Sequence, residues 1–97
     1  MKDKRCAMPI KNFLILSILY SGQSKEVSEI YQILLLEYEI EISLSGLYVV
    51  INKMKNDKLI YSCYVDDKKY VLTITQIGKE EFKETRKILE KVFSDKK

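Results

Sequence analysis

The sequence contains no histidine, no tryptophan, one proline and three glycines among its 97 residues. Histidine is the usual general base of enzymes and a common zinc ligand, so both roles lose their most frequent residue. The two cysteines, Cys6 and Cys63, match no zinc-site spacing. The glycines form no phosphate-binding loop, and no serine or cysteine stands at motif spacing from a base. The sequence therefore predicts no enzyme activity, no metal site and no cofactor.

One cluster of acids resembles a metal site on paper. Glu37, Glu39 and Glu41 alternate along the chain, and carboxylates can bind metals or act as general bases. A solvated face is the simpler interpretation, because residues 12–44 carry five glutamates and only one lysine. An acidic general-base site is the alternative that this pattern leaves open.

The sequence also has no hydrophobic run suited to a membrane. The apolar stretch at residues 13–20 is far shorter than the about 20 residues that span a bilayer. The basic start "MKDKR" resembles the beginning of a signal peptide. However, Pro9, Lys11 and Asn12 interrupt the junction, and no small-residue cleavage site follows. We therefore expect a cytoplasmic protein whose cysteines are reduced thiols rather than a disulfide.

The chain does have a large apolar fraction and a mild basic excess. Hydrophobic residues make up 46% of it, which predicts one folded domain over residues 1–97. A domain this small is only marginally stabilised by its own core, so a homodimer is expected. The formal net charge is +3, but residues 12–44 are net acidic while the segments on both sides are net basic. One face could thus approach phosphate while another repels it.

Two helices are predicted in the first half. Pro9 suits the first turn of a helix, and the segment after it is apolar nearly all round until it ends near residues 21–22. Ser24 is the predicted N-cap of the second helix, with Glu26 in its first turn. The core-facing stripe of this helix is Val27, Ile30, Tyr31, Leu34 and Tyr38. Residues 39–43 alternate polar and apolar, which predicts a brief strand or an extended linker.

A third helix is predicted over residues 43–56, with Ser43 or Ser45 as its N-cap. Its inward stripe is Leu44, Leu47, Val50, Ile51 and Met54. The positions outside this stripe are polar or basic for the most part, with Tyr48 and Asn52 among them. Such a face suits contact with a polar, negatively charged surface.

A hairpin and a last helix complete the chain. Residues 59–65 and 70–75 predict two strands joined by the tight polar turn 66–69. Thr75 is the predicted N-cap of a helix over residues 76–93. The expected fold is therefore mainly α with a small β hairpin: a winged helix-turn-helix with three helices, a two-stranded wing and a C-terminal dimerisation helix. In this arrangement the third helix enters the major groove and the hairpin lies along the backbone.

Three stretches resemble PadR-like transcriptional regulators. "LYVVINKMKNDKLI" resembles their "LYPALKRLEKEGLI" type of stretch, "KYVLTITQIGKEEF" resembles "RRYYRLTEAGREEL", and "FLILSIL" fits the opening "ILALL" pattern. The resemblance covers residues 12–93, and its most specific elements are the Leu47-Tyr48 pair and Thr75-x-x-Gly78. It implies a winged helix that binds DNA and pairs through its last and first helices.

The chain departs from this pattern at several positions, which indicates a divergent member. Residues 27–30 read "VSEI" where the family usually has "GYEI". Val49 stands where the family has proline, and Lys58 stands where it has glycine. The hairpin turn is short and lacks the arginines common there. Winged-helix proteins that bind plasmid centromere DNA would show much the same pattern.

The candidate DNA contacts lie on the third helix and the hairpin turn. Serine hydroxyls at the helix start can bind a phosphate, Asn52 has the paired donor and acceptor that suit adenine, and lysines add electrostatic attraction. The predicted DNA-binding residues are Ser43, Ser45, Tyr48, Asn52, Lys53, Lys55, Lys68 and Lys69. Asp66 and Asp67 nearly cancel the charge of the last two lysines. Residues 1–8 are expected to form a flexible arm, more a solubilising tail than a DNA contact.

The last helix carries a short seam of the coiled-coil kind. Phe82 and Leu89 are seven residues apart, as are Thr85 and Val92. With Phe93, these four are the predicted dimerisation residues; packing of the stripe on its own domain is the alternative. A small-molecule effector could bind beside such an interface, near Tyr20, Phe82 and Phe93, although aromatic residues at helical spacing usually belong to the core.

The sequence thus favours a cytoplasmic, homodimeric DNA-binding transcriptional regulator. The expected mechanism is repression by steric occlusion, with two recognition helices in adjacent major grooves of a palindromic operator of double-stranded DNA. One alternative is a centromere-binding adaptor for plasmid or phage DNA segregation, which would bind tandem repeats. The other is a protein–protein interaction module.

Overall fold

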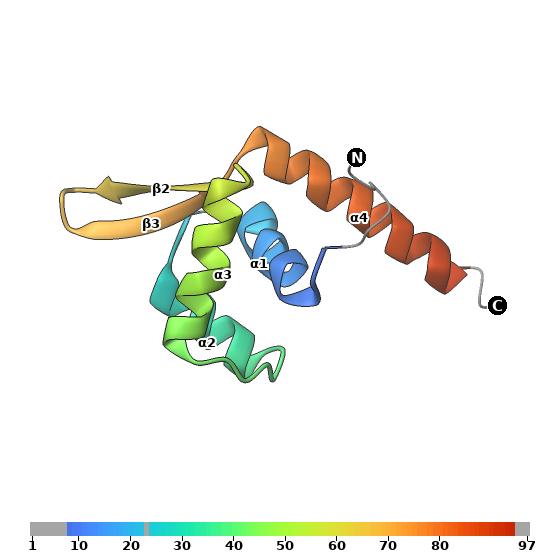
Figure 1. Cartoon of the computed structure of the whole chain (residues 1–97), viewed down its shortest axis with the longest axis horizontal. Coiled ribbons are helices and arrows are strands. Elements are labelled where there is room, and N and C mark those ends of the chain that lie inside the picture. The colour runs from blue at the N-terminus through green and yellow to red at the C-terminus, as the bar shows by residue number, and fades with distance from the viewer. Residues whose placement is uncertain (1–7, 23, 95–97) are drawn as a thin grey trace.

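The computed structural model describes residues 8–22 and 24–94 and has the predicted order of elements (Figure 1). Three helices come first, interrupted by a two-residue strand, followed by a hairpin and a long helix. The helices are α1 (Ile10–Ser21), α2 (Val27–Leu36), α3 (Leu44–Asn56) and α4 (Gln76–Ser94). The strands are β1 (Lys25–Glu26), β2 (Ile60–Val65) and β3 (Lys69–Ile74).

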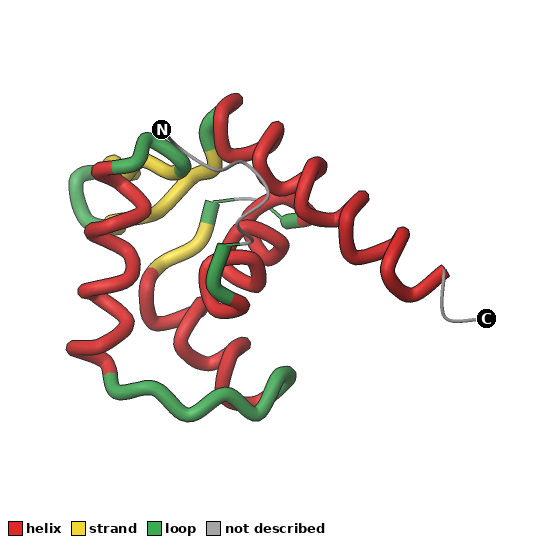
Figure 2. The backbone as a smooth tube through the Cα atoms, turned by 45° about the vertical axis from the view of Figure 1, so that its right-hand side comes forward, coloured by secondary structure: helices red, strands yellow, loops and turns green. Residues whose placement is uncertain are grey.

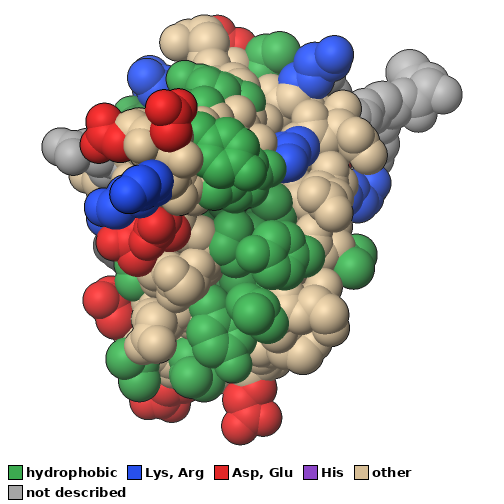
Figure 3. Space-filling view, turned by 90° about the vertical axis from the view of Figure 1, so that its left-hand side faces the viewer, with side chains coloured by type: hydrophobic (Ala, Val, Ile, Leu, Met, Phe, Trp, Pro, Cys, Tyr) green, Lys and Arg blue, Asp and Glu red, His purple; other side chains and the backbone are tan. Residues whose placement is uncertain are grey.

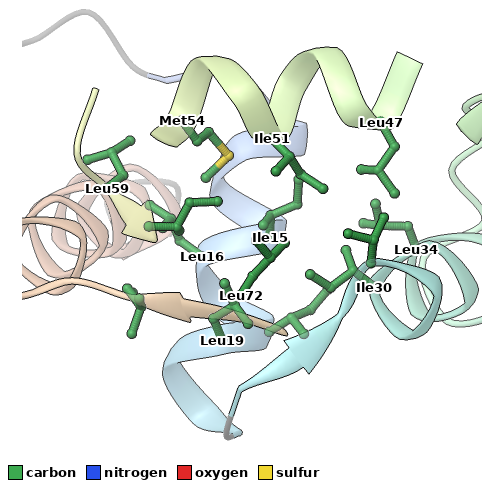
Figure 4. Packing of buried hydrophobic residues seen from close by; sticks show 14 of the residues in the cluster. Ile15, Leu16, Leu19, Ile30, Leu34, Leu47, Ile51, Met54, Leu59 and Leu72 are labelled. Carbon is green, nitrogen blue, oxygen red and sulfur yellow. The ribbon is translucent and has the colours of Figure 1, made fainter. Parts of the chain in front are cut away.

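Helix α1 lies at the centre of the fold, as its all-round apolar surface predicts. Figure 4 shows Ile15, Leu16 and Leu19 of α1 between the side chains of α2 and α3, with Leu72 of β3 beside them. Helix α3 contributes Leu47, Ile51 and Met54, and α2 contributes Ile30 and Leu34. One apolar core therefore joins the first three helices to the sheet.

The second helix begins later than the sequence prediction, and its cap is different. Glu26, not Ser24, is the N-cap: its side chain accepts the Glu29 backbone N–H, and Glu29 Oε1 accepts the Glu26 N–H at 2.8 Å. This reciprocal capping box satisfies two backbone donors. The Ser24 hydroxyl instead forms a hydrogen bond with that of Thr73, at 2.6 Å. The predicted cap at Ser24 is therefore wrong.

Displacement of the cap lets the preceding residues pair with the hairpin. Lys25 lies opposite Leu72 and Glu26 lies opposite Val71, so the sheet has three antiparallel strands in the order β1-β3-β2. The sequence predicted the two strands of the wing but not β1, because a two-residue strand has no periodicity to detect.

Two residues assigned to inward stripes lie elsewhere. Helix α2 ends at Leu36, so Tyr38 falls in the following loop and is exposed. Leu44 is the first residue of α3 and is also exposed, because the helix has not yet reached the core at that point. Residues 39–43 form no strand: this segment is the extended linker, with Ile40 and Ile42 packed against the core.

The junction between the wing and α4 explains the Thr75-x-x-Gly78 pattern. Thr75 Oγ1 accepts the Gly78 N–H at 2.9 Å and donates to the carbonyl oxygens of Lys58 and Leu59, 2.7 and 3.0 Å away. Thr75 therefore caps α4, as predicted. A Cβ at Gly78 would collide with the Leu59 carbonyl. Only glycine lets α4 approach the chain this closely.

Helix α4 leaves the body of the molecule after its first half. Phe82 is buried, with its ring stacked on Phe13 of α1 at 5.1 Å between centroids. Further along, the helix diverges from the other elements in both backbone views (Figures 1 and 2), and the molecule measures 48 × 31 × 23 Å along its principal axes. Within the described residues no helix is long and apolar enough to cross a membrane.

Candidate nucleic-acid interface

The outer face of α3 is exposed along its whole length. Leu47, Ile51 and Met54 point into the core, so at 100° per residue the opposite side is formed by other positions. This side carries the exposed residues Ser45, Val49, Asn52, Lys53 and Asn56. Amide, hydroxyl and ammonium groups thus follow one another along a helix that is free on its outer side.

The N-terminal end of α3 is fixed by Ser43. Its hydroxyl accepts the Gly46 N–H at 3.0 Å, so Ser43 and not Ser45 is the N-cap. The Ser45 hydroxyl lies 3.3 Å from that of Ser43 and is itself exposed. Of the two predicted phosphate-binding serines, Ser43 is therefore occupied by its own helix, while Ser45 remains available to a ligand.

The C-terminal end of α3 is fastened to the wing by Lys55. Its ammonium donates to the Tyr70 hydroxyl at 3.0 Å, and that hydroxyl donates to Ser62 at 2.8 Å. The ammonium also lies 5.6 Å from the centre of the Tyr70 ring. The Lys55 hydrogen bond, assisted by Ser62, lowers the pKa of Tyr70 from its ordinary 10.0. Lys55 is half-buried, so the structure places it at the junction between α3 and the wing.

Lys53 differs from Lys55 in its surroundings. Its ammonium lies 3.9 Å from the carboxylate of Asp57, and both side chains are largely exposed. Such exposed pairs contribute little stability. Lys53 can therefore exchange this partner for a phosphate at small cost.

The wing's turn carries charges of both signs. Asp66 and Asp67 both have positive φ, 59° and 61°, and the Lys68 N–H donates to the Val65 carbonyl. Aspartate tolerates this left-handed backbone better than most residues. Lys68 and Lys69 are exposed beside the two carboxylates, so the turn has no net formal charge.

Comparisons with known proteins identify the fold. No protein-family model and no curated protein sequence matches the chain. Among solved structures, a PadR family transcription regulator from hypervirulent Clostridium difficile superposes with a TM-score of 0.74 at 20% identity, over 90% of this chain and 97% of that one. The chain is a winged helix. The similarity to PadR-like regulators that the sequence indicated is confirmed in the structure.

Two further structures show the same winged helix. The protein F93 from STIV, described as a winged-helix DNA-binding protein, has a TM-score of 0.76 at 29% identity, covering 88% of this chain and 92% of its own. RosR of H. salinarum has a TM-score of 0.72 at 22% identity, covering 96% of this chain and 80% of its own. The likeness extends over 88–96% of this chain in the three structures.

The linker between α2 and α3 is acidic. Residues 27–52 contain no lysine or arginine, and Glu37, Glu39 and Glu41 in and beside this linker are exposed. Their carboxylates face solvent. Among residues 8–22 and 24–94, no group of three or more acids, cysteines or histidines is arranged to hold a metal ion. A shallow hollow of about 440 Å³ lies nearby, lined by Tyr31, Leu35, Glu41, Ile42 and Ser43.

The predicted dimerisation residues fall into three groups by burial. Phe82 is buried in its own domain, between Phe13 and Tyr20, whose ring centres lie 5.1 and 4.7 Å away. Val92 and Phe93 are exposed on the projecting half of α4, where Ile88 is also exposed. Thr85 and Leu89 lie between these extremes and are half-buried.

Sequence reasoning missed the part played by the wing's aromatic residues. Tyr64 and Tyr70 lie opposite each other on β2 and β3, with ring centres 5.1 Å apart, and neither was a candidate. The period-2 alternation of a strand places Ser62 and Tyr64 on one face, and that signal could have identified them. The predicted arm at residues 1–8 lies mostly outside the described residues; Met8 packs against the core.

Proposed function

We propose that this winged helix is a DNA-binding transcription regulator that uses α3 as its recognition helix. The observation that carries the proposal is the outer face of α3, which is exposed and mostly polar, on a helix held at its two ends by Ser43 and Lys55. A helix of this kind fits the major groove of B-DNA, where its side chains can reach base edges. Regulators and a DNA-binding protein among the similar structures support this proposal.

The proposed roles on α3 follow from the chemistry of each side chain. Asn52 presents a donor and an acceptor together, which suits the N6 and N7 atoms of adenine. Lys53 and the Ser45 hydroxyl contact phosphate, as Tyr48 also can from the neighbouring side of the helix. Lys55 adds positive charge at the end of α3, while Lys68 and Lys69 are exposed at the wing's turn beside Asp66 and Asp67.

The active form we propose is a cytoplasmic homodimer that represses transcription by steric occlusion. Ile88, Val92 and Phe93 expose apolar surface on the projecting half of α4, and burial against a second copy would remove it from water. If the two-fold symmetry of this dimer sets its α3 helices about 34 Å apart, one turn of DNA, they would match the half-sites of a palindromic operator.

Selection of random DNA duplexes by the purified protein tests this function. We expect an inverted repeat with half-sites one helical turn apart, bound with an affinity that falls steeply as salt rises. Enrichment of direct repeats bound cooperatively would instead indicate an adaptor for DNA segregation. Failure to enrich any duplex, with binding that does not change with salt, would overturn the proposal and favour a protein–protein interaction module.

A further inference from the structure

The wing has two chemically different faces. Cross-strand pairing places Ser62 and Tyr64 opposite Leu72 and Tyr70, while Tyr61 and Cys63 belong to the other face of β2. The hydrogen bond between Lys55 and Tyr70 shows that the first face is the one turned toward α3. We name the pair Tyr64 and Tyr70 the wing aromatic face.

The wing aromatic face is pre-formed and open. Tyr70 is held between Lys55 and Ser62 by hydrogen bonds of 3.0 and 2.8 Å, which fixes its ring. Tyr64 packs against this ring, yet 67% of it is exposed. Viewed from the end of the molecule where the wing projects, a continuous band of hydrophobic side chains runs down the surface, with most charged groups at its sides (Figure 3).

Helix α3 presents a tyrosine on the same side. Tyr48 is seven residues before Lys55, so it lies about two turns, or about 10 Å, along the helix on the face that carries Lys55. Tyr48 is also exposed. Exposed aromatic rings of α3 and of the wing therefore lie on the side of the molecule where Lys55 contacts Tyr70.

The turn at the tip of the wing, residues 66–69, attracts phosphate only weakly. Asp66 and Asp67 stand directly before Lys68 and Lys69, so the turn attracts a phosphate only as strongly as the two lysines exceed the two carboxylates. Any DNA strand close to the turn would also meet the carboxylates. The turn therefore gives the wing little net attraction for a polyanion.

We propose that the wing binds DNA through Tyr64 on its aromatic face rather than through its charged turn; this inference rests on the proposed function. In this contact the Tyr64 ring packs on a deoxyribose of the backbone beside α3, and its hydroxyl donates to a phosphate oxygen. Tyr70 acts as a positioning residue that holds the Tyr64 ring. The contact adds affinity without adding charge, so it releases no counterions.

The test compares two tyrosines of one strand on a duplex that the protein has selected. Tyr64→Ala should weaken binding roughly 5-fold or more, as loss of an aromatic contact with nucleic acid does, with an unchanged dependence on salt. Tyr61→Ala, on the opposite face, is the matched control and should stay within about twofold of the wild type. Tyr64→Phe separates the effect of the ring from that of the hydroxyl. This variant should retain most of the binding affinity that the ring contributes.

Three results bear on the inference and on the function separately. A Tyr64→Ala variant that binds like the wild type overturns the inference and leaves the function intact. So does a Lys68→Ala/Lys69→Ala variant that loses more affinity than Tyr64→Ala and has a shallower salt dependence. A wild-type protein that binds no duplex overturns both. Unfolding curves of the variants check that they fold. We expect them to fold, because the Tyr64 and Tyr61 side chains are exposed.

Discussion

Helices α3 and α4 are both amphipathic and both capped by a hydroxyl, yet they are held in opposite ways. Helix α3 is fixed at its two ends, by Ser43 and by Lys55, and Leu47, Ile51 and Met54 on its inner side are buried. Helix α4 is fixed only in its first half, where Gly78 and Phe82 are buried. The exposed surface of α3 is mostly polar around Val49, whereas the projecting half of α4 exposes three apolar side chains among its charged ones: Ile88, Val92 and Phe93. A rigid polar face suits DNA, and a projecting apolar one suits a second copy of the chain.

The largest effect on the stability of the fold is expected where α4 is attached. In Gly78→Ala the new methyl group meets the Leu59 carbonyl, so α4 must shift away from the wing. We expect a loss of about 2–4 kcal/mol in the free energy of unfolding, measured by denaturant titration. Lys79→Ala, at the next and exposed position, should change it by less than about 0.5 kcal/mol. Equal stability of the two variants would show that the close approach at Gly78 does not hold α4.

Measurement of the oligomeric state tests whether the projecting half of α4 forms the proposed dimer interface. Val92→Asp with Phe93→Ser removes two exposed apolar side chains from each chain and adds a charge. The proposed dimer would bury four such side chains, so it should dissociate roughly 10,000-fold more readily, given about 1.5 kcal/mol for each. Ile77→Asp is the control, because Ile77 is also exposed but lies in the fixed half. Sedimentation equilibrium measures both. A double variant as dimeric as the control would place the interface elsewhere.

Two substitutions on the outer face of α3 should weaken DNA binding in different ways. Asn52→Ala should cost about 1–3 kcal/mol at a single base pair and relax the preference there. Lys53→Ala should weaken binding to all sequences alike and reduce the salt slope by about 1. Titrations of matched and substituted duplexes at several salt concentrations separate the two. If neither change alters affinity or slope, the outer face of α3 is not the interface.

A smaller effect is expected just beyond the end of α3. Lys58 has a φ of 65°, in the left-handed region that favours glycine. Lys58→Gly should therefore stabilise the fold by about 0.5–1 kcal/mol, since a residue with a Cβ is strained there by about 1–2 kcal/mol. Asp57→Gly, at a φ of −81°, should bring no gain. A Lys58→Gly variant no more stable than the wild type would argue against this strain.

The smallest effect concerns the link between α3 and the wing. Tyr70 has a lowered pKa in the folded chain, mainly because of its hydrogen bond with Lys55, against an ordinary value of 10.0. Between the folded pKa and 10.0 the unfolded chain binds more protons, so stability rises with pH across that window and is unaffected at neutral pH. Tyr70→Phe should lack this alkaline rise. The difference between the ultraviolet titrations of the two proteins should show one tyrosine ionising early; a difference at the ordinary pKa would contradict the link.

Periodicity was sufficient to predict the helices, the wing and the winged-helix fold. The caps at Ser43 and Thr75 were also predictable, because each hydroxyl precedes an amphipathic segment. The cap at Glu26 was missed, since a carboxylate and a serine two residues apart compete for the same role, and a pairing with β3 decided between them. Tyr38 was misassigned because periodicity does not fix where α2 ends.

The site was less predictable than the fold. Lys55 reads as a free cation in the sequence, and only its contact with Tyr70, fifteen residues away, shows that it fastens the wing. Phe82 fits a heptad with Leu89, but its ring is occupied by Phe13 and Tyr20 of its own chain. Such side-chain partners depend on how distant segments pack, which spacing along one element does not encode.

The most direct test that α3 and the wing contact DNA is a map of backbone amide chemical shifts, measured by NMR on addition of the selected duplex. The account predicts the largest shifts over residues 45–56 of α3 and residues 62–70 of the wing, with little change in the projecting half of α4. Shifts confined to α4 or to the acidic linker 37–43, or no shifts with any duplex, would contradict it.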